Sequence, residues 1–185
     1  MLPYRDYSHR CHMNYFVVQV KTREEERYRS LARQVLHDSP VRLVFPKRRL
    51  RQLRRGNWKD ILKPLYPGYI FLEGDELTVE DYWKLRKVPG FLRFLETNAN
   101  IKPIEGADRE LLLHFLRFGE VVEKSKVTFD SDSRIRVLEG PLAGLEGRII
   151  KIDKRKGRAK VRLDLYKSTF PVDLGFDVIE NAVGR

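Results

Sequence analysis

The alternation of apolar and polar positions changes character near residue 119. Before that point, short apolar runs typical of strands alternate with segments of helical period. We expect strands at 14–20, 41–46, 69–72 and 91–95, and helices at 23–36, 81–87 and 108–118. Pro67 and Gly68 predict a turn before the third strand, because proline fixes φ and glycine adopts φ values that other residues avoid. This order of elements predicts an α+β fold.

The remainder of the chain is different in kind. Short alternating runs separated by turn-forming residues occur at 134–137, 147–152, 160–165 and 170–173, which predicts a small all-β barrel. Residues 119–128 have mixed charges and no helical period, so we interpret them as a linker. Residues 47–64 are too polar for a core and are interpreted as a long loop. Residues 1–12 lack the apolar stretch of a signal peptide and are expected to form a disordered extension.

Composition narrows the classes of partner. The 185 residues, 42% of them hydrophobic, are enough for one ordinary domain or two small ones. The formal net charge of +11 favours a polyanionic partner, although a merely solvated basic surface is the alternative. A single cysteine, Cys11, excludes an internal disulfide framework, and no apolar run approaches the roughly 18 residues of a membrane helix. We therefore expect a cytoplasmic protein that does not associate with membranes.

No pattern in the sequence points to catalysis. The phosphate loop GxxxxGK[ST] and the nucleophile motif GxSxG are both absent. His9, Cys11 and His12 lie close together but lack the further ligands of a tetrahedral zinc site. We expect no enzyme activity, no cofactor and no metal.

The strongest motif lies in the predicted barrel. Residues 134–153, RIRVLEGPLAGLEGRIIKID, resemble the KOW motif, in which a strand, a Gly-Pro turn and a further glycine precede the next strand. Residues 156–180 look like the distal half of the C-terminal domain of the NusG family of transcription elongation factors. In the first half, YFVVQV (15–20), LYPGYIFL (65–72) and LRKVPGFLRFL (85–95) are similar to signature segments of the same family. The resemblance covers nearly everything after Met13.

This resemblance implies a domain plan and a first partner. It implies an NGN-type α/β sandwich at 13–118, a linker at 119–128 and an SH3-like KOW barrel at 129–183. The first domain is expected to bind the clamp helices of the largest subunit of RNA polymerase, near upstream DNA and the non-template strand. The factor is expected to be a monomer. In the family, an exposed aromatic patch binds polymerase. The resemblance places this patch here at Tyr15, Tyr66, Pro67, Gly68 and Tyr69. Phe16 beside it is expected to be core instead.

Two basic clusters account for most of the excess charge. Residues 42–63 contain nine Lys or Arg against one Asp. Six of them are the predicted contacts with DNA phosphates: Lys47, Arg48, Arg49, Arg51, Arg54 and Arg55. Residues 151–167 contain eight cations against two Asp, and these are the predicted RNA-binding residues: Lys151, Lys154, Arg155, Lys156, Arg158, Lys160, Arg162 and Lys167.

One departure from the family pattern concerns the protein partners of the barrel. General family members carry a Phe-Gly-Arg type turn around which ribosomal protein S10 or Rho binds, whereas residues 165–168 here read LYKS. Leu165 and Tyr166 are the predicted partner-binding residues at this position. The changed turn and the basic face favour a specialised paralogue similar to LoaP, whose barrel binds a hairpin in nascent RNA. The alternatives are a general NusG that recruits the ribosome or Rho, and a ribosomal-type KOW protein that binds RNA.

Overall fold

The computed structural model describes residues 13–95 and 101–179. Predictions that fall on residues 1–12, including the disordered extension and the His9, Cys11 and His12 group, lie outside these residues. The chain divides into two compact units, the first comprising residues 1–45 and 66–113 and the second residues 46–65 and 114–185.

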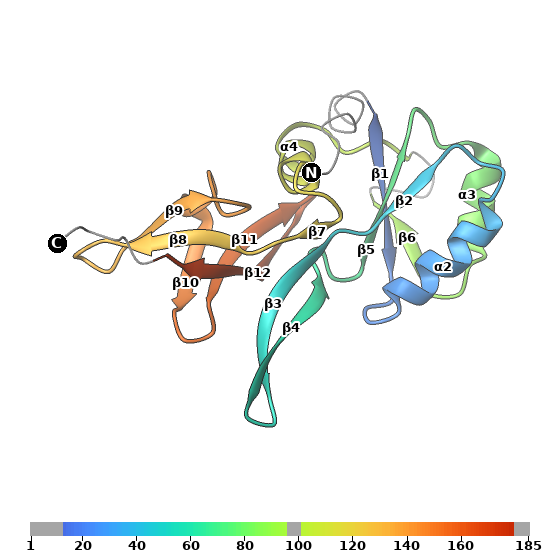
Figure 1. The fold of residues 1–185 in the computed structure, drawn as a ribbon. Coiled ribbons are helices and arrows are strands. Elements are labelled where there is room, and N and C mark those ends of the chain that lie inside the picture. Colours follow the sequence, from blue (N-terminus) through green and yellow to red (C-terminus); the bar gives the residue numbers. More distant parts are fainter. Residues whose placement is uncertain (1–12, 96–100, 180–185) are drawn as a thin grey trace. The chain divides into compact units, whose positions relative to one another are not determined.

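The first unit contains a four-stranded antiparallel sheet with the order β2-β5-β1-β6 (Figure 1). Its strands are β1 (Asn14–Val20), β2 (Arg42–Val44), β5 (Tyr69–Gly74) and β6 (Phe91–Phe94), and its helices are α2 (Glu25–Val35), α3 (Val79–Arg86) and the start of α4 (Gly106–Leu116). Each element predicted for this region is present, with its ends within two residues of the prediction. The α+β prediction is confirmed.

Both faces of this sheet are buried. On one face, Phe16, Val18, Ile70 and Leu72 pack in a core with residues of α2 and α3, so Phe16 is core as expected. The hydroxyl of Tyr28 in α2 donates to the carbonyl of Leu85 in α3 at 3.1 Å, and burial raises the pKa of that hydroxyl. This core orders the strands that lead into the predicted docking turn.

The opposite face is held together by a buried carboxylate. Glu73 in β5 is only 5% exposed and lies between β1 and β2. Its Oε1 accepts from the hydroxyl of Tyr15 at 2.6 Å, and its Oε2 accepts from Nε of Arg42 at 2.5 Å. All three residues are register partners across the three strands. Buried charge is costly unless it is paired, so donors such as Tyr15 and Arg42 stabilise Glu73 here.

The turn before β5 has the predicted geometry. Tyr69 N donates to the carbonyl of Tyr66 at 3.1 Å, and Gly68 between them has φ +82°, which together define a type II turn with Pro67 at its second position. The Gly68 N–H donates to Oε1 of buried Glu25 at 2.9 Å, and its carbonyl accepts from Val20 N at 2.8 Å. The turn is therefore fixed to both α2 and β1.

The second unit contains a five-stranded sheet with the order β10-β11-β12-β8-β9. Its strands are β8 (Ser125–Phe129), β9 (Ile135–Glu139), β10 (Ile149–Asp153), β11 (Arg158–Leu165) and β12 (Ser168–Val178), with the short 3-10 helix η1 (Glu146–Arg148) before β10. The four strands predicted for the barrel are present, and β12 is longer than predicted. The segment interpreted as a linker contains β7 (Val121–Val122) and most of β8. The domain boundaries themselves stay a prediction.

The interpretation of residues 47–64 as a loop is wrong. They form an antiparallel hairpin of β3 (Lys47–Arg54) and β4 (Asn57–Pro64), and β3 also pairs in parallel with β7. Arg55 and Gly56 form the two-residue turn with φ +48° and +78°, the signs of a type I′ hairpin turn. Lys and Arg occupy so many strand positions that the period of two is hidden in the sequence.

The hairpin packs against β12 of its own unit at a glycine. A Cβ on Gly175 would lie 2.7 Å from the carbonyl oxygen of Arg49 and 2.8 Å from Cγ of Lys124. Nearby, the Arg158 guanidinium donates through Nη2 to the carbonyl of Arg51, and Leu50 is buried. Only glycine lets the two backbones approach this closely.

Replacing Gly175 with Ala is therefore expected to displace the hairpin and to lower the free energy of unfolding by about 1–3 kcal/mol, the usual cost of overpacking. Gly147→Ala is the matched control, because a Cβ on Gly147 would meet no atom within 4 Å. Guanidinium chloride titration of the full chain measures both variants. Equal stability of the two variants would contradict the close packing of hairpin and barrel.

Replacing Tyr15 with Phe removes a hydroxyl that donates to Glu73. We expect a loss of about 1–3 kcal/mol, since a buried carboxylate then loses a short hydrogen bond. The Tyr15→Phe, Glu73→Gln double variant should lose less than the sum of the two single variants, because the residues act through one network. Strict additivity in thermal or denaturant unfolding would show that the bond contributes nothing.

Candidate functional site

The five residues predicted to dock polymerase are not equally accessible. Tyr15 is 0% and Tyr66 1% exposed, and Gly68 is buried as well. Pro67 is exposed and Tyr69 is half-buried. The rings of Tyr66 and Phe71 meet edge to face with centroids 5.1 Å apart, which supports the turn from beneath. The surface that a partner can touch is thus the turn itself, and the docking role of the five residues stays a prediction.

The six cations predicted to contact DNA phosphates separate into an inner and an outer group. Arg48 belongs to the inner group, and its Nη1 donates to the carbonyl of Pro64. Burial lowers the pKa of the Arg48 guanidinium to about 10, while the charge of Asp173 opposes this shift and that of Arg158 adds to it. Arg48 is half-buried and its guanidinium is largely shielded from water, so it is a weaker candidate for a phosphate contact than exposed Arg54 and Arg55.

The outer group follows the hairpin toward its turn. Arg54 and Arg55 are exposed, and the Arg51 guanidinium lies 5.2 Å from the ring centroid of the half-buried Trp58. Arg49 is held by Glu123 through an ion pair of 2.7 Å, and Lys47 is half-buried. This combination suits nucleic acid, because the cations can contact backbone phosphates and the partly accessible indole can stack on a base.

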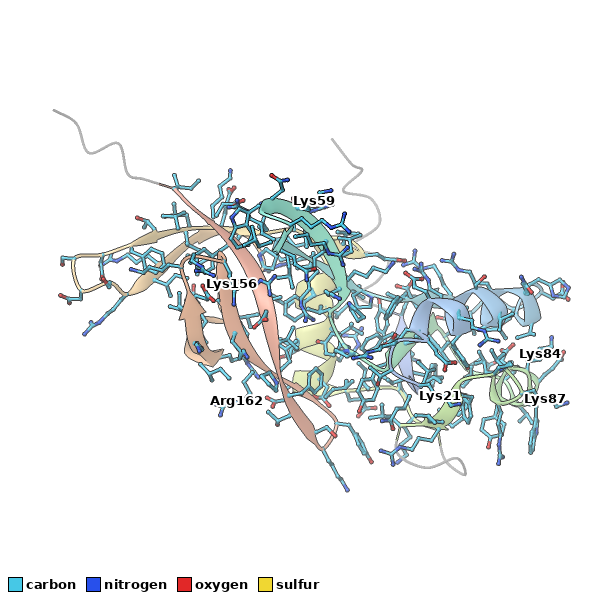
Figure 2. All side chains as sticks on the ribbon, turned by 90° about the horizontal axis from the view of Figure 1, so that it is seen from below. Lys21, Lys59, Lys84, Lys87, Lys156 and Arg162 are labelled. Carbon is cyan, nitrogen blue, oxygen red and sulfur yellow. The ribbon has the colours of Figure 1, made fainter. Side chains whose placement is uncertain are left out.

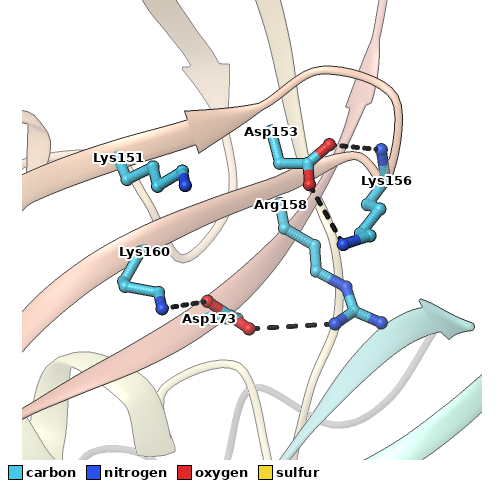
Figure 3. Close-up of a pocket in the computed structure, with 6 residues that line it drawn as sticks. All are labelled: Lys151, Asp153, Lys156, Arg158, Lys160 and Asp173. Atoms are coloured by element: carbon cyan, nitrogen blue, oxygen red, sulfur yellow. Dashed lines mark hydrogen bonds and ion pairs between the residues drawn. The ribbon is translucent and has the colours of Figure 1, made fainter.

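The eight barrel cations occupy three places. The first is a cleft of about 140 Å³ lined by Lys151, Lys156, Arg158 and Lys160 together with two carboxylates, Asp153 and Asp173 (Figure 3). Lys156 Nζ lies 3.4 Å from Asp153, while Arg158 and Lys160 lie 3.8 and 4.0 Å from Asp173. A hydrogen bond from the backbone N of Lys156 is the main cause that lowers the pKa of Asp153.

The second and third places lie outside the cleft. Lys154 and Arg155 are exposed in the turn between β10 and β11, with Lys154 Nζ 4.0 Å from the ring centroid of Phe129. Arg162 is exposed farther along β11, and Lys167 lies over the ring of Tyr166 at 5.6 Å. Lys156 and Arg162 can be located on the barrel in Figure 2. Phosphate groups could therefore reach these cations at several points of one unit.

The two predicted partner-binding residues also differ. Leu165 is 1% exposed and belongs to the barrel core, whereas Tyr166 is 39% exposed in the turn between β11 and β12. Tyr166 has φ +57°, an unusual value for a residue with a ring. Only Tyr166 can present its side chain to a partner.

Acidic residues that the sequence pattern does not single out organise these surfaces. Asp173 interacts with three arginine and lysine side chains from β3 and β11. Asp164 accepts from Arg148 at 2.6 Å and from Thr169 at 2.7 Å. In the sequence, these residues stand out only as carboxylates within a basic strand pattern. Their partners can be identified only once the strand register is known.

Two further observations concern metal ions and membranes. Within residues 13–95 and 101–179, no group of three or more His, Cys, Asp or Glu side chains is arranged to hold a metal ion. No helix in the same part of the chain is long and apolar enough to cross a membrane.

Comparison with known proteins identifies the family. A family model described as "Transcription termination factor nusG" matches residues 13–113, and the Thermus thermophilus transcription termination/antitermination protein NusG is 28% identical over 157 residues, covering 80% of this chain and 84% of that protein. The Bacillus subtilis protein of the same name is 28% identical over 162 residues, covering 87% and 89%.

A solved structure agrees with the fold. It is titled "Domain interaction in Thermotoga maritima NusG" and has a TM-score of 0.56 and 21% identity, covering 88% of this chain and 93% of that chain. Since the family model matches more than half of the sequence, this chain belongs to the NusG family of transcription termination and antitermination factors, which are not enzymes.

Proposed function

We propose that this chain is an antitermination or elongation factor that attaches to RNA polymerase through its first unit and binds a hairpin in nascent RNA through its barrel. Members of the NusG family bind RNA polymerase. The observation that carries the RNA part is a set of exposed cations on the β10, β11 and turn surfaces of one small barrel: Lys151, Lys154, Arg155, Lys156, Arg162 and Lys167. Several phosphates that meet such a surface at once release their counterions together.

The dock on polymerase is assigned to the type II turn. Pro67 is exposed and Tyr69 half-buried on a turn that Glu25 and Val20 hold rigid. A preordered turn loses little conformational freedom on binding, and aromatic residues are frequent anchors of interfaces. The clamp helices of the largest subunit are the partner that the family resemblance implies.

The β3–β4 hairpin is assigned to DNA. Arg54 and Arg55 at its turn, with Arg51 beside Trp58, are the cations available to phosphates of upstream DNA or the non-template strand. Arg48 is the weakest candidate for this role, because its guanidinium is largely shielded and donates to the carbonyl of Pro64. Contacts of this kind position the factor and carry no sequence information themselves.

We assign recognition of RNA by the barrel to the shape of the folded hairpin. Few aromatic rings of the described barrel residues are accessible for stacking, chiefly the exposed Tyr166 and the half-buried Phe129 and Phe170. A surface rich in cations and poor in rings suits the backbone of a folded hairpin better than splayed single-stranded bases. This role corresponds to a specialised paralogue similar to LoaP.

A general NusG role is the second candidate, and the exposed ring of Tyr166 favours it. In that case the turn at Tyr166 would recruit ribosomal protein S10 or Rho, and the basic face would be solvated surface. The ribosomal-type alternative leaves the NusG match over residues 13–113 without a role.

The RNA assignment predicts that the full chain binds a folded RNA hairpin more tightly than its single-stranded scramble. Replacing Lys154, Arg155 and Arg162 with Ala should weaken binding and lower the salt dependence, by about 0.7–0.9 in log–log slope for each phosphate that is no longer neutralised. Fluorescence titrations at two salt concentrations measure both quantities. Lys21→Ala, an exposed cation of the first unit, is the control (Figure 2).

Equal and salt-insensitive binding of hairpin and scramble by all variants would contradict RNA binding by the barrel. The general NusG candidate would then stand.

The docking assignment predicts that Tyr69→Ala weakens binding to core RNA polymerase by about 2 kcal/mol, roughly thirtyfold, and leaves RNA affinity unchanged. Trp83→Ala is the matched control, because Trp83 is an aromatic residue of the same unit that is 50% exposed on α3. Competition binding with labelled wild-type chain measures the change. A Tyr69 variant that binds polymerase as the wild type does would place the dock elsewhere.

A further inference from the structure

The strand register brings like charges face to face on the outer surface of the barrel. Lys151 in β10 pairs directly with Lys160 in β11, and Lys160 pairs on its other side with Asp173 in β12. Cross-strand partners point to the same face of a sheet, and like charges directly opposite are destabilising. Lys156 joins them from the turn that follows β10 (Figure 3). An anion between the lysines would remove this repulsion.

The carboxylates in the cleft do not fully neutralise these cations. The three ion pairs inside it measure 3.4, 3.8 and 4.0 Å. Elsewhere on the same barrel, Arg148 and Asp164 are 2.6 Å apart, and Lys126 and Glu139 are 2.5 Å apart. Charge-assisted hydrogen bonds are about 2.7–2.9 Å long, so the cleft pairs are weak, and the Lys156–Asp153 pair is the one with a side-chain hydrogen bond.

Lys151 contributes an additional free donor. It is exposed and forms no ion pair with any residue that the structure describes. The cleft thus holds four cations against two carboxylates. Its volume of about 140 Å³ is about ten times the roughly 10–15 Å³ that one water molecule requires. A polyatomic anion fits the space and the charge.

Arg158 closes one end of the cleft but is already engaged. Its Nη2 donates to the carbonyl of Arg51, its Nη1 faces Asp173, and its side chain is 19% exposed. The turn beside it is also fixed, because Lys156 N donates to Asp153 at 2.9 Å and a Cβ on Gly157 would lie 2.6 Å from the carbonyl of Phe176. The donors left for a ligand are the ammonium groups of Lys151, Lys156 and Lys160.

We infer that this cleft binds a single phosphate group through Lys151, Lys156 and Lys160. The inference rests on the proposed function for the source of the ligand, which is then one phosphate of the RNA backbone. Free phosphate has the same chemistry and enters the test as a separate probe.

The first arm of the test is a titration of the full chain with inorganic phosphate, followed by backbone amide NMR at constant ionic strength. We expect saturable shift changes at Lys151, Lys156, Gly157 and Lys160, and the loss of saturation in the Lys151→Ala, Lys160→Ala double variant. Lys126→Ala on β8 is the control and should titrate like the wild type. Shifts that stay linear, or that are equal in the double variant, overturn the site.

The second arm identifies the source. For a hairpin RNA, the double variant should lower the salt slope by about 0.7–0.9, the value for one phosphate, and each single variant by no more than that. A drop of about twice that size would show two independent contacts and overturn the single-phosphate site. An unchanged slope with retained phosphate saturation would overturn the RNA source. If the wild type binds no RNA, the proposed function fails, and the phosphate titration still decides the cleft.

Discussion

The close approach of the β3–β4 hairpin to β12 is the constraint on which the second unit depends. It places the guanidinium groups of Arg48 and Arg158 near one carboxylate, Asp173, with little access to water. Buried charges are costly unless their donors are satisfied. Here the carbonyls of Pro64 and Arg51 accept from one Nη atom of each guanidinium, while Nε of both residues is buried without a hydrogen-bond partner in the described part of the chain. Gly175 makes this arrangement possible, because any side chain there would collide with Arg49 or Lys124.

This packing divides the basic residues by role. Arg48 and Arg158 donate to backbone carbonyls inside the protein, so they shape the unit and are poor candidates for phosphate contacts. The cations that a polyanion can reach are Lys151, Lys154, Arg155, Lys156, Lys160 and Arg162. The net charge of the chain therefore overstates the number of phosphate contacts, and only the surface group should contribute to salt dependence.

The sequence predicted most of the fold and less of the site. Apolar periodicity located β1, α2 and the Pro67–Gly68 turn because their buried side chains are apolar and their turn residues are distinctive. It failed for the hairpin, where arginine and lysine fill positions on both faces, and for β7, which is too short to show a period. The burial of Tyr15 and Tyr66 was also beyond it, since an aromatic residue beside a turn can point either way.

In the proposed function, one chain binds polymerase through its first unit and nascent RNA through its barrel. Photocrosslinking of the full chain in a transcribing elongation complex, with mass spectrometry of the crosslinked peptides, tests this most directly. We predict crosslinks from polymerase to the peptide containing Pro67 and Tyr69, and from nascent RNA to peptides of β10 and β11. Nascent RNA crosslinked only to the first unit, or to neither unit, would contradict the claim.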